Sequence, residues 1–310
     1  MIILLNLFFI LLGSLILWKG ADTLVESAVS ISRKLGISPF LVGVTIVAFG
    51  TSLPEAMASI NAHLILGKTS LAVANILGSN ITNITLVLGP CALLCAIPLN
   101  KNLLKFDFPA LLFFNALLAY FLMSSEMSFN LGLIFLASYV FFIVYKSLKE
   151  KNSSQEAQED SLFSWPKETG LLILSLVLLP LGTHFLVKGG VGIGQSLSLS
   201  DRFIGLTFVA LGTSGPELAT SLVAAAKKET DLAIANILGS NILNITLLGL
   251  LGVLNPFKAA FSYFQSDLYL NLFLTLFLIA IVIFCKKIHK LLGLCFLLIY
   301  LSFILFNMIY

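Results

Sequence analysis

Two stretches of the chain share one motif: GVTIVAFGTSLPEAMAS at residues 43–59 and GLTFVALGTSGPELATS at residues 205–221. They lie 162 positions apart, counted from residue 43 to residue 205. A second pair of blocks, ANILGSNITNITL at 74–86 and ANILGSNILNITL at 235–247, lies 161 positions apart. Two blocks that repeat in the same order at nearly the same offset indicate an internal duplication.

Apolar residues dominate the chain around these blocks. The 310 residues are 58% hydrophobic and 11% charged, whereas about 25% of the residues of a soluble domain are charged. Apolar runs of about 20 residues fit a lipid bilayer. We therefore predict an all-α polytopic membrane protein with ten transmembrane helices. They are expected near residues 2–32, 39–66, 70–98, 104–123, 129–148, 167–198, 202–226, 231–255, 267–286 and 290–309.

Basic residues mark alternate loops between these predicted helices. One set of loops carries most of them: Arg33, Lys34, Lys101, Lys105, Lys146, Lys149, Lys151, Lys227, Lys228, Lys286, Lys287 and Lys290. The other set carries only Lys68, Arg202 and Lys258. Because basic loops stay in the cytoplasm, we predict that both termini lie outside.

Each copy of the duplication contains five predicted helices, which is an odd number. The second copy must then enter the membrane from the opposite side, as in secondary transporters whose site lies near the midplane between inverted repeats. We assign residues 1–148 to the first five-helix repeat and residues 167–310 to the second, inverted one. The polar stretch 149–166 between them is predicted to be a cytoplasmic linker.

The motif GTS-x-PE places an acidic residue inside an apolar helix in both copies, at Glu55 and Glu217. A proline inside a helix removes one backbone donor and breaks or kinks the helix, and Pro54 and Pro216 precede these glutamates directly. A carboxylate within the membrane is costly, so such a residue indicates a functional site. Two of them at equivalent positions of two inverted copies make a purely structural role improbable.

The second repeated block supplies further polar groups. Ser79 and Asn83 lie four residues apart, as do Ser240 and Asn244, so each pair shares one helical face. Carboxylate, hydroxyl, amide and carbonyl oxygens suit Ca²⁺, Na⁺ and similar hard cations. Two carboxylates would balance one Ca²⁺, two monovalent ions or two protons. Since an empty pair of buried charges is costly, this balance favours exchange of one cation for another.

These motifs resemble the repeats of the calcium/cation antiporter superfamily, and in particular those of prokaryotic sodium/calcium exchangers. The resemblance covers essentially the whole chain. It implies a multi-pass protein of the prokaryotic inner (plasma) membrane that exchanges Ca²⁺ for Na⁺, is no enzyme, needs no cofactor and functions as a monomer. It also implies that the first and sixth helices slide against the other eight, and Gly13, Gly20, Gly182 and Gly189 fit such a sliding surface.

The same resemblance implies a set of ligands for the transported cations. Glu55 and Glu217 would be the principal Ca²⁺ ligands, and Asn83 would add an amide oxygen. Hydroxyl groups and two backbone carbonyls would complete the Na⁺ and Ca²⁺ positions: Thr51, Ser52, Thr213, Ser214, Ser79, Ser240 and the carbonyls of Ala48 and Ala210. We include Asn244 as the repeat equivalent of Asn83.

Two positions depart from the pattern of the family. Asn244 stands where sodium/calcium exchangers of this type usually carry Asp, so one potential negative charge is missing and a Ca²⁺/H⁺ antiporter remains the alternative. Gly215 stands where the first copy has Leu53 and would loosen the second helix break. An intramembrane enzyme and a channel are weaker alternatives. The duplicated Glu-Ser-Asn set offers no asymmetric catalytic roles, and saturable countertransport would exclude a channel.

Overall fold

The computed structural model describes residues 2–99, 101–151, 164–198 and 210–309. The first half contains α1 (Ile2–Leu35), α2 (Pro39–Val42), η1 (Gly43–Val47), α3 (Ala48–Thr51), α4 (Leu53–Ile60), η2 (Asn61–Ile65), α5 (Thr69–Thr82), η3 (Asn83–Val87), α6 (Leu88–Leu94), η4 (Lys101–Leu104), α7 (Asp107–Ser124) and α8 (Phe129–Lys151). The second half contains α9 (Trp165–Ser196), α11 (Ala210–Thr213), α12 (Gly215–Ala226), α13 (Thr230–Leu254), α14 (Phe261–Phe284) and α15 (Lys290–Ile309). The fold is all-α and polytopic, as predicted.

Eight of the described helices are long and apolar enough to cross a membrane, and one bent pair, Pro39–Thr51 with Leu53–Ile65, forms a ninth candidate. The boundaries agree with the predicted spans to within a few residues at most ends. The predicted span 202–226 is described only from residue 210, as α11 and α12, so its first part and Arg202 lie outside the described residues. Residues 152–163 of the predicted linker lie outside them as well.

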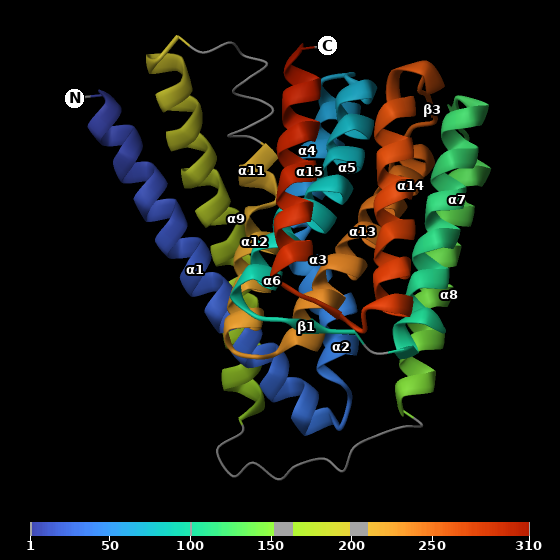
Figure 1. The fold of residues 1–310 in the computed structure, drawn as a ribbon. Coiled ribbons are helices and arrows are strands. Elements are labelled where there is room, and N and C mark those ends of the chain that lie inside the picture. Colours follow the sequence, from blue (N-terminus) through green and yellow to red (C-terminus); the bar gives the residue numbers. More distant parts are fainter. Residues whose placement is uncertain (1, 100, 152–163, 199–209, 310) are drawn as a thin grey trace.

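The long helices α1 and α9 lie side by side and lean away from the remaining bundle (Figure 1). Their backbones meet at glycines: a Cβ atom on Gly13 would lie 2.7 Å from the carbonyl oxygen of Gly182, and one on Gly189 would lie 2.5 Å from that of Asn6. Gly20 faces Leu178 and Leu179 of α9. The four glycines therefore lie between α1 and α9 themselves, where they allow the two backbones to pack closely. The prediction that they form the surface on which these two helices slide against the others is wrong.

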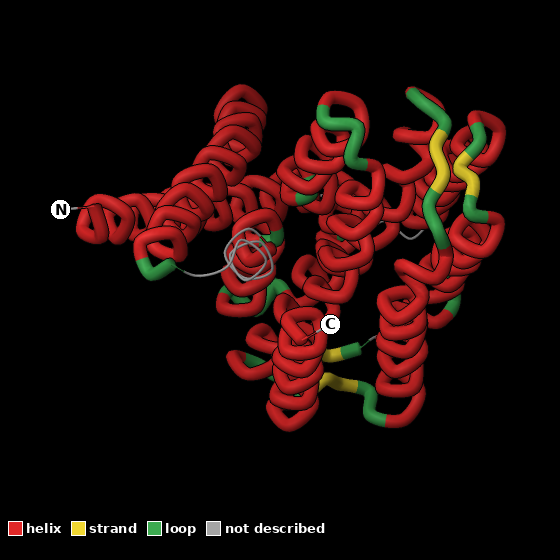
Figure 2. The backbone as a smooth tube through the Cα atoms, turned by 90° about the horizontal axis from the view of Figure 1, so that it is seen from above, coloured by secondary structure: helices red, strands yellow, loops and turns green. Residues whose placement is uncertain are grey.

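Four two-residue strands connect the halves of the chain: β1 (Ile97–Pro98), β2 (Glu126–Met127), β3 (Phe257–Lys258) and β4 (Lys287–Ile288). β1 pairs with β4 and β2 pairs with β3, both antiparallel. In register, Ile97 faces Ile288 and Met127 faces Phe257. Figure 2 shows the two pairs on separate sides of the bundle. Each pair joins one strand of the first half to one of the second.

Helix α13 forms the centre of the bundle. Every residue from Leu232 to Gly249 is buried, which is the pattern of a helix surrounded by other helices on all sides. Gly239 allows α13 to approach the first broken helix closely, because a Cβ atom there would lie 2.8 Å from the Cβ of Ala48 and 2.8 Å from the backbone of Val44. The repeated motifs are thus packed directly against one another.

Candidate cation site

Both GTS-x-PE motifs form helix breaks in the described structure. Ser52 separates α3 from α4 with φ −82° and ψ 5°, and Ser214 separates α11 from α12 with φ −84° and ψ 9°. In the first motif the helix axis bends by 44° at this point. A proline at the second position of α4 and of α12 is compatible with the start of a new helix, since its missing N–H would have no intrahelical acceptor there.

The breaks bring the two glutamates into contact with the opposite half of the molecule. Glu55 and Glu217 are both 0% exposed. The hydroxyl group of Ser52 donates to Oε1 of Glu217 at 3.0 Å, and that of Ser214 donates to Oε1 of Glu55 at 3.3 Å. Each serine therefore donates a hydrogen bond to the glutamate of the other repeat, so the side chains of the two motifs meet.

One oxygen of each carboxylate remains open for a ligand. Oε2 of Glu55 and Oε2 of Glu217 have no hydrogen-bond partner among the described residues. An unsatisfied polar group in a low-dielectric interior costs about 1–3 kcal/mol, and more if it is charged. A cation or proton bound between the two side chains would relieve this cost.

Thr51 connects the first break to the centre of the bundle. Its hydroxyl group donates to Oδ1 of Asn236 at 3.0 Å and lies 3.4 Å from Oγ of Ser240. Asn236 in turn donates to Oγ of Ser221 at 3.0 Å. The equivalent amide in the first half, Asn75, donates to Oγ of Ser59 at 2.9 Å. These bonds fix the broken helices against α5 and α13.

Asparagines of the second motif form another link between the halves. The side-chain amide of Asn80 donates to the carbonyl oxygen of Asn241 at 3.3 Å, and that of Asn241 donates to the carbonyl oxygen of Asn80 at 3.2 Å. Asn83 donates to Oδ1 of Asn241 at 3.0 Å, which leaves its own Oδ1 without a partner in the described part of the chain. For Asn244, which is fully buried, neither side-chain atom has a partner among these residues.

The remaining predicted ligands occupy less decisive positions. The carbonyl oxygen of Ala48 accepts the N–H of Ser52 at 3.0 Å and the hydroxyl of Thr51 at 3.3 Å, so a cation would compete with these donors. Ser79 is buried on α5. Ala210 begins α11, the helix that ends at Thr213, and its side chain lies outside the described part of the structure.

A cavity of about 640 Å³ reaches the two breaks from the side of α9. Its lining includes Pro54 and Thr213 of the two motifs, Thr183, His184 and Lys188 of α9, and Asn6 of α1. The ammonium group of Lys188 lies 4.5 Å from the ring centre of Phe9. This cavity is therefore lined by residues of both GTS-x-PE motifs.

A family model for sodium/calcium exchanger proteins matches residues 5–148 and residues 167–309. The chain belongs to this family. The resemblance inferred from the repeated motifs is thereby confirmed, and the family is one of membrane transporters rather than of catalytic enzymes.

Individual relatives agree with this assignment. A putative antiporter, CaxA of Alkalimonas amylolytica, is 42% identical over 79% of this chain and 78% of its own length. The sodium/calcium exchanger MaX1 of Methanosarcina acetivorans is 30% identical over 82% and 85%. A solved structure of the sodium–calcium exchanger NCX_Mj soaked with Na⁺ and Sr²⁺ superimposes with a TM-score of 0.82 at 32% identity, covering 97% of both chains.

Some buried polar residues of the broken helices were not predicted from the sequence. Thr220 of α12 is fully buried, and its hydroxyl has no partner in the described structure. At the 162-residue offset, Thr220 corresponds to Ala58 in the first copy. Because the two residues differ, comparison of the copies gives no signal for Thr220. Ser59 and Ser221 are equivalent, and their conservation between the copies was a usable signal for the bonds they make to Asn75 and Asn236.

Proposed function

We propose that this chain exchanges Ca²⁺ for Na⁺ across the membrane at a site centred on Glu55 and Glu217. One observation carries the proposal: two fully buried carboxylates, each held by a serine of the opposite repeat, each present one oxygen without a partner among the described residues. Two negative charges with oxygen-only neighbours match one Ca²⁺ or two Na⁺. The family assignment supports the same substrates.

The transport mechanism that we infer is alternating access between two inverted repeats, residues 1–148 and 167–310, joined by the linker 149–166. The crossed strand pairs support this arrangement, because β1 and β3 are separated by nearly the repeat offset, and so are β2 and β4. The site would lie near the midplane between the repeats. Helices α1 and α9, which touch through glycine backbones, would slide against the other eight predicted spans and open the site to each side in turn.

The ligand set that we propose follows the two breaks and the helices packed against them. Glu55 and Glu217 bind Ca²⁺ directly, and the amide oxygens of Asn83 and Asn244 lie on the adjoining helices. Hydroxyl and carbonyl groups complete the Na⁺ positions: Thr51, Ser52, Thr213, Ser214, Ser79, Ser240, Ala48 and Ala210. The distribution of basic residues between the loops favours a topology with both termini outside. All of the proposed ligands belong to one chain, which favours a functional monomer without a cofactor.

A Ca²⁺/H⁺ antiporter is the second candidate, and Asn244 favours it. A neutral amide at this position leaves only two carboxylates to hold the coupling ions. Its side chain is fully buried with no partner among the residues that the structure describes, so it is free to act as a neutral ligand. Two protons would balance the two glutamates as well as two Na⁺ ions do.

Reconstituted vesicles with separately imposed gradients test these proposals. Ca²⁺ uptake driven by an outward Na⁺ gradient, with the proton gradient collapsed by an ionophore, is the expected result. If only a pH gradient drives Ca²⁺ uptake, the coupling ion is H⁺ and the proposal of Na⁺ as the coupling ion is wrong. Failure of every gradient to drive Ca²⁺ uptake, in vesicles shown to contain folded protein, would contradict the antiporter itself.

A further inference from the structure

Helices α7 and α8 border a groove of about 500 Å³ that the transport site does not use. Six of its twelve lining residues are aromatic. Two of these aromatic side chains are strongly exposed: Phe113 is 50% exposed and Phe141 is 71% exposed. Small side chains at Ala110 and Ala137 leave the space between the rings open. An exposed aromatic groove on a transmembrane bundle is in contact with lipid chains rather than with water.

One end of this groove, which we call the basic end, carries Lys105, Lys146 and Lys149. Asp107 binds the ammonium group of Lys146 at 2.8 and 3.0 Å and neutralises it. Lys105 is exposed, and the ammonium group of Lys149 lies over the ring of Phe106 at 3.2 Å from its centre. Two positive charges therefore remain at the end of the groove, as counted over the described side chains.

The basic end lies at the level expected for lipid headgroups. Lys105 lies two residues before the start of α7, and Lys149 lies in the last turn of α8. Both helices are candidate membrane spans, so their ends at this side mark the boundary of the hydrocarbon region. By the positive-inside rule this boundary belongs to the cytoplasmic leaflet, where anionic lipids attract basic clusters.

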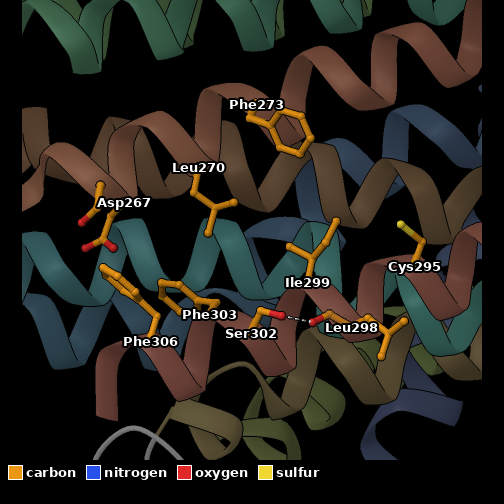
Figure 3. A pocket seen from close by; sticks show the side chains of 10 residues that line it. Asp267, Leu270, Phe273, Cys295, Leu298, Ile299, Ser302, Phe303 and Phe306 are labelled. Carbon is orange, nitrogen blue, oxygen red and sulfur yellow. Dashed lines mark hydrogen bonds between the residues drawn. The ribbon is translucent and has the colours of Figure 1, made fainter. Parts of the chain in front are cut away.

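The second half contains the equivalent groove, between α14 and α15, with a volume of about 520 Å³. Eight of its ten lining residues lie 161 positions after lining residues of the first groove, so that Lys105 corresponds to Ser266, Phe106 to Asp267 and Tyr145 to Phe306. Figure 3 shows Asp267 at one end of this groove, beside Phe303 and Phe306, while Phe273 and Ile299 line its length. The shape is thus repeated, but the charge at the polar end is reversed.

We propose that the α7–α8 groove binds an anionic phospholipid. The phosphate lies between Lys105 and Lys149, and an acyl chain lies along Phe113, Phe114 and Phe141. Charge complementarity selects this occupant, since the groove combines an apolar trough with two lysines at the headgroup level. The equivalent α14–α15 groove has the same trough but an acidic end, so it does not select an anionic headgroup.

Native mass spectrometry of the purified full chain tests this binding with dioleoyl phosphatidylglycerol and dioleoyl phosphatidylcholine as the two probes. The wild-type chain is expected to retain phosphatidylglycerol more tightly. The double substitution Lys105→Gln/Lys149→Gln should reduce that preference about 25-fold, since each lysine near a membrane surface contributes about fivefold. A matched control, Lys68→Gln/Lys258→Gln, changes the net charge equally at exposed lysines away from the groove and should leave the preference unchanged.

Two further measurements locate the lipid. Ala137→Trp fills the groove and should reduce binding of phosphatidylglycerol without changing the charge. Glycerol phosphate, which has the headgroup phosphate but no acyl chain, should not displace the lipid. Equal retention of both lipids by the wild-type chain, an unchanged preference in the groove double variant, or displacement by glycerol phosphate would each overturn the proposal. Elution of every variant at the wild-type volume establishes that it is folded.

Discussion

Glu55 and Glu217 have matching surroundings, whereas the amides on the helices packed around them do not. Each glutamate is fully buried and accepts a hydroxyl hydrogen bond from the serine of the other repeat. Asn83, by contrast, donates to Asn241, while Asn244 has no side-chain partner in the described regions. The charged centre of the site is therefore symmetric, and its amide periphery is not.

The backbone differs between the halves at the same place. The first half changes from α-helix to a π-helical segment, η3, at Asn83, whereas α13 continues as a regular α-helix through Asn244. A single π-helical turn is frequent at functional sites because it re-aims one side chain. Two copies of one sequence motif can therefore keep equivalent surroundings for their glutamates while the backbone and the side-chain contacts of the neighbouring asparagines differ.

The largest effect is expected from removing either charge of the symmetric pair. Glu55→Gln and Glu217→Gln each keep the shape of the side chain but remove one of the two negative charges that would balance a bound Ca²⁺. Loss of one partner from a buried charged set costs about 3–5 kcal/mol, so Ca²⁺ uptake into vesicles should fall at least about 100-fold in both variants.

Glu126→Gln serves as the control for these variants, because Glu126 is an exposed residue of β2. It should transport at the wild-type rate. If one of the two site variants retained wild-type flux while the other lost it, the symmetry of the charged centre would be broken and only one glutamate would hold the ion.

The serines test the crossed bonds between the repeats. Ser52→Ala and Ser214→Ala each remove a hydrogen bond to a carboxylate, worth about 1.5–3 kcal/mol, so the apparent affinity for Ca²⁺ should fall about tenfold or more. The 3.0 Å bond of Ser52 is shorter than the 3.3 Å bond of Ser214, so Ser52→Ala should have the larger effect. The apparent Ca²⁺ affinity of each variant is measured from initial uptake rates at increasing Ca²⁺ concentrations. Wild-type affinity in both variants would contradict a role for these two hydrogen bonds in Ca²⁺ binding.

The asymmetric amides are tested by Asn244→Asp, which adds a third carboxylate. An added charge near a cation contributes about 1 kcal/mol or more even in a high-dielectric setting, so Na⁺ should compete with Ca²⁺ at a concentration about fivefold lower. Competition of Na⁺ against Ca²⁺ uptake measures this shift. Asn255→Asp, at an exposed position, is the matched control, and an unchanged Na⁺ response in Asn244→Asp would contradict the role given to this amide.

The smallest effect is expected at the far end of α1, where Lys227 contacts Asp22 and Glu26. Burial alone would lower the pKa of Lys227, but its hydrogen bonds to these two carboxylates and their charges raise it above the ordinary value of 10.5. The contribution of Lys227 to the stability of the folded protein is therefore complete at neutral pH. It is lost only as the pH rises through the raised pKa of the lysine. Lys227→Met should lower the thermal stability in detergent by about 0.2–1 kcal/mol per ion pair.

Lys228→Met is the control for Lys227→Met, because the neighbouring lysine is exposed and has the same charge. A loss of stability in both variants would assign the effect to net charge instead of to the contacts with α1. A measurement at neutral pH is sufficient, since the ion pairs are fully formed there.

The sequence predicted the parts of this site that depend on periodicity and composition. Paired motifs at one offset predicted that Glu55 and Glu217 would be equivalent, and Pro54 and Pro216 predicted the helix breaks. The spans followed from apolar runs, because a bilayer imposes a length on each helix. These features are local, so a single sequence contains them.

Contacts across the repeats could not be predicted in the same way. Self-comparison aligns Ser52 with Ser214 but does not say that each binds the glutamate of the other copy. A π-helical segment differs from an α-helix by about one extra residue in a single turn. A hydrophobic pattern locates a helix only to within a few residues, so it does not reveal such a change. The strands β1 to β4 contain two residues each, too few for an alternating pattern to indicate them.

Equilibrium binding of radioactive Ca²⁺ to the purified chain tests the central claim most directly, because it is independent of the coupling ion and of the sliding of α1 and α9. We predict saturable binding of one Ca²⁺ per chain in the wild type, competition by Na⁺ or by protons, and no specific binding in Glu55→Gln or in Glu217→Gln. Undiminished Ca²⁺ binding in both variants would contradict the assignment of the site to these two carboxylates.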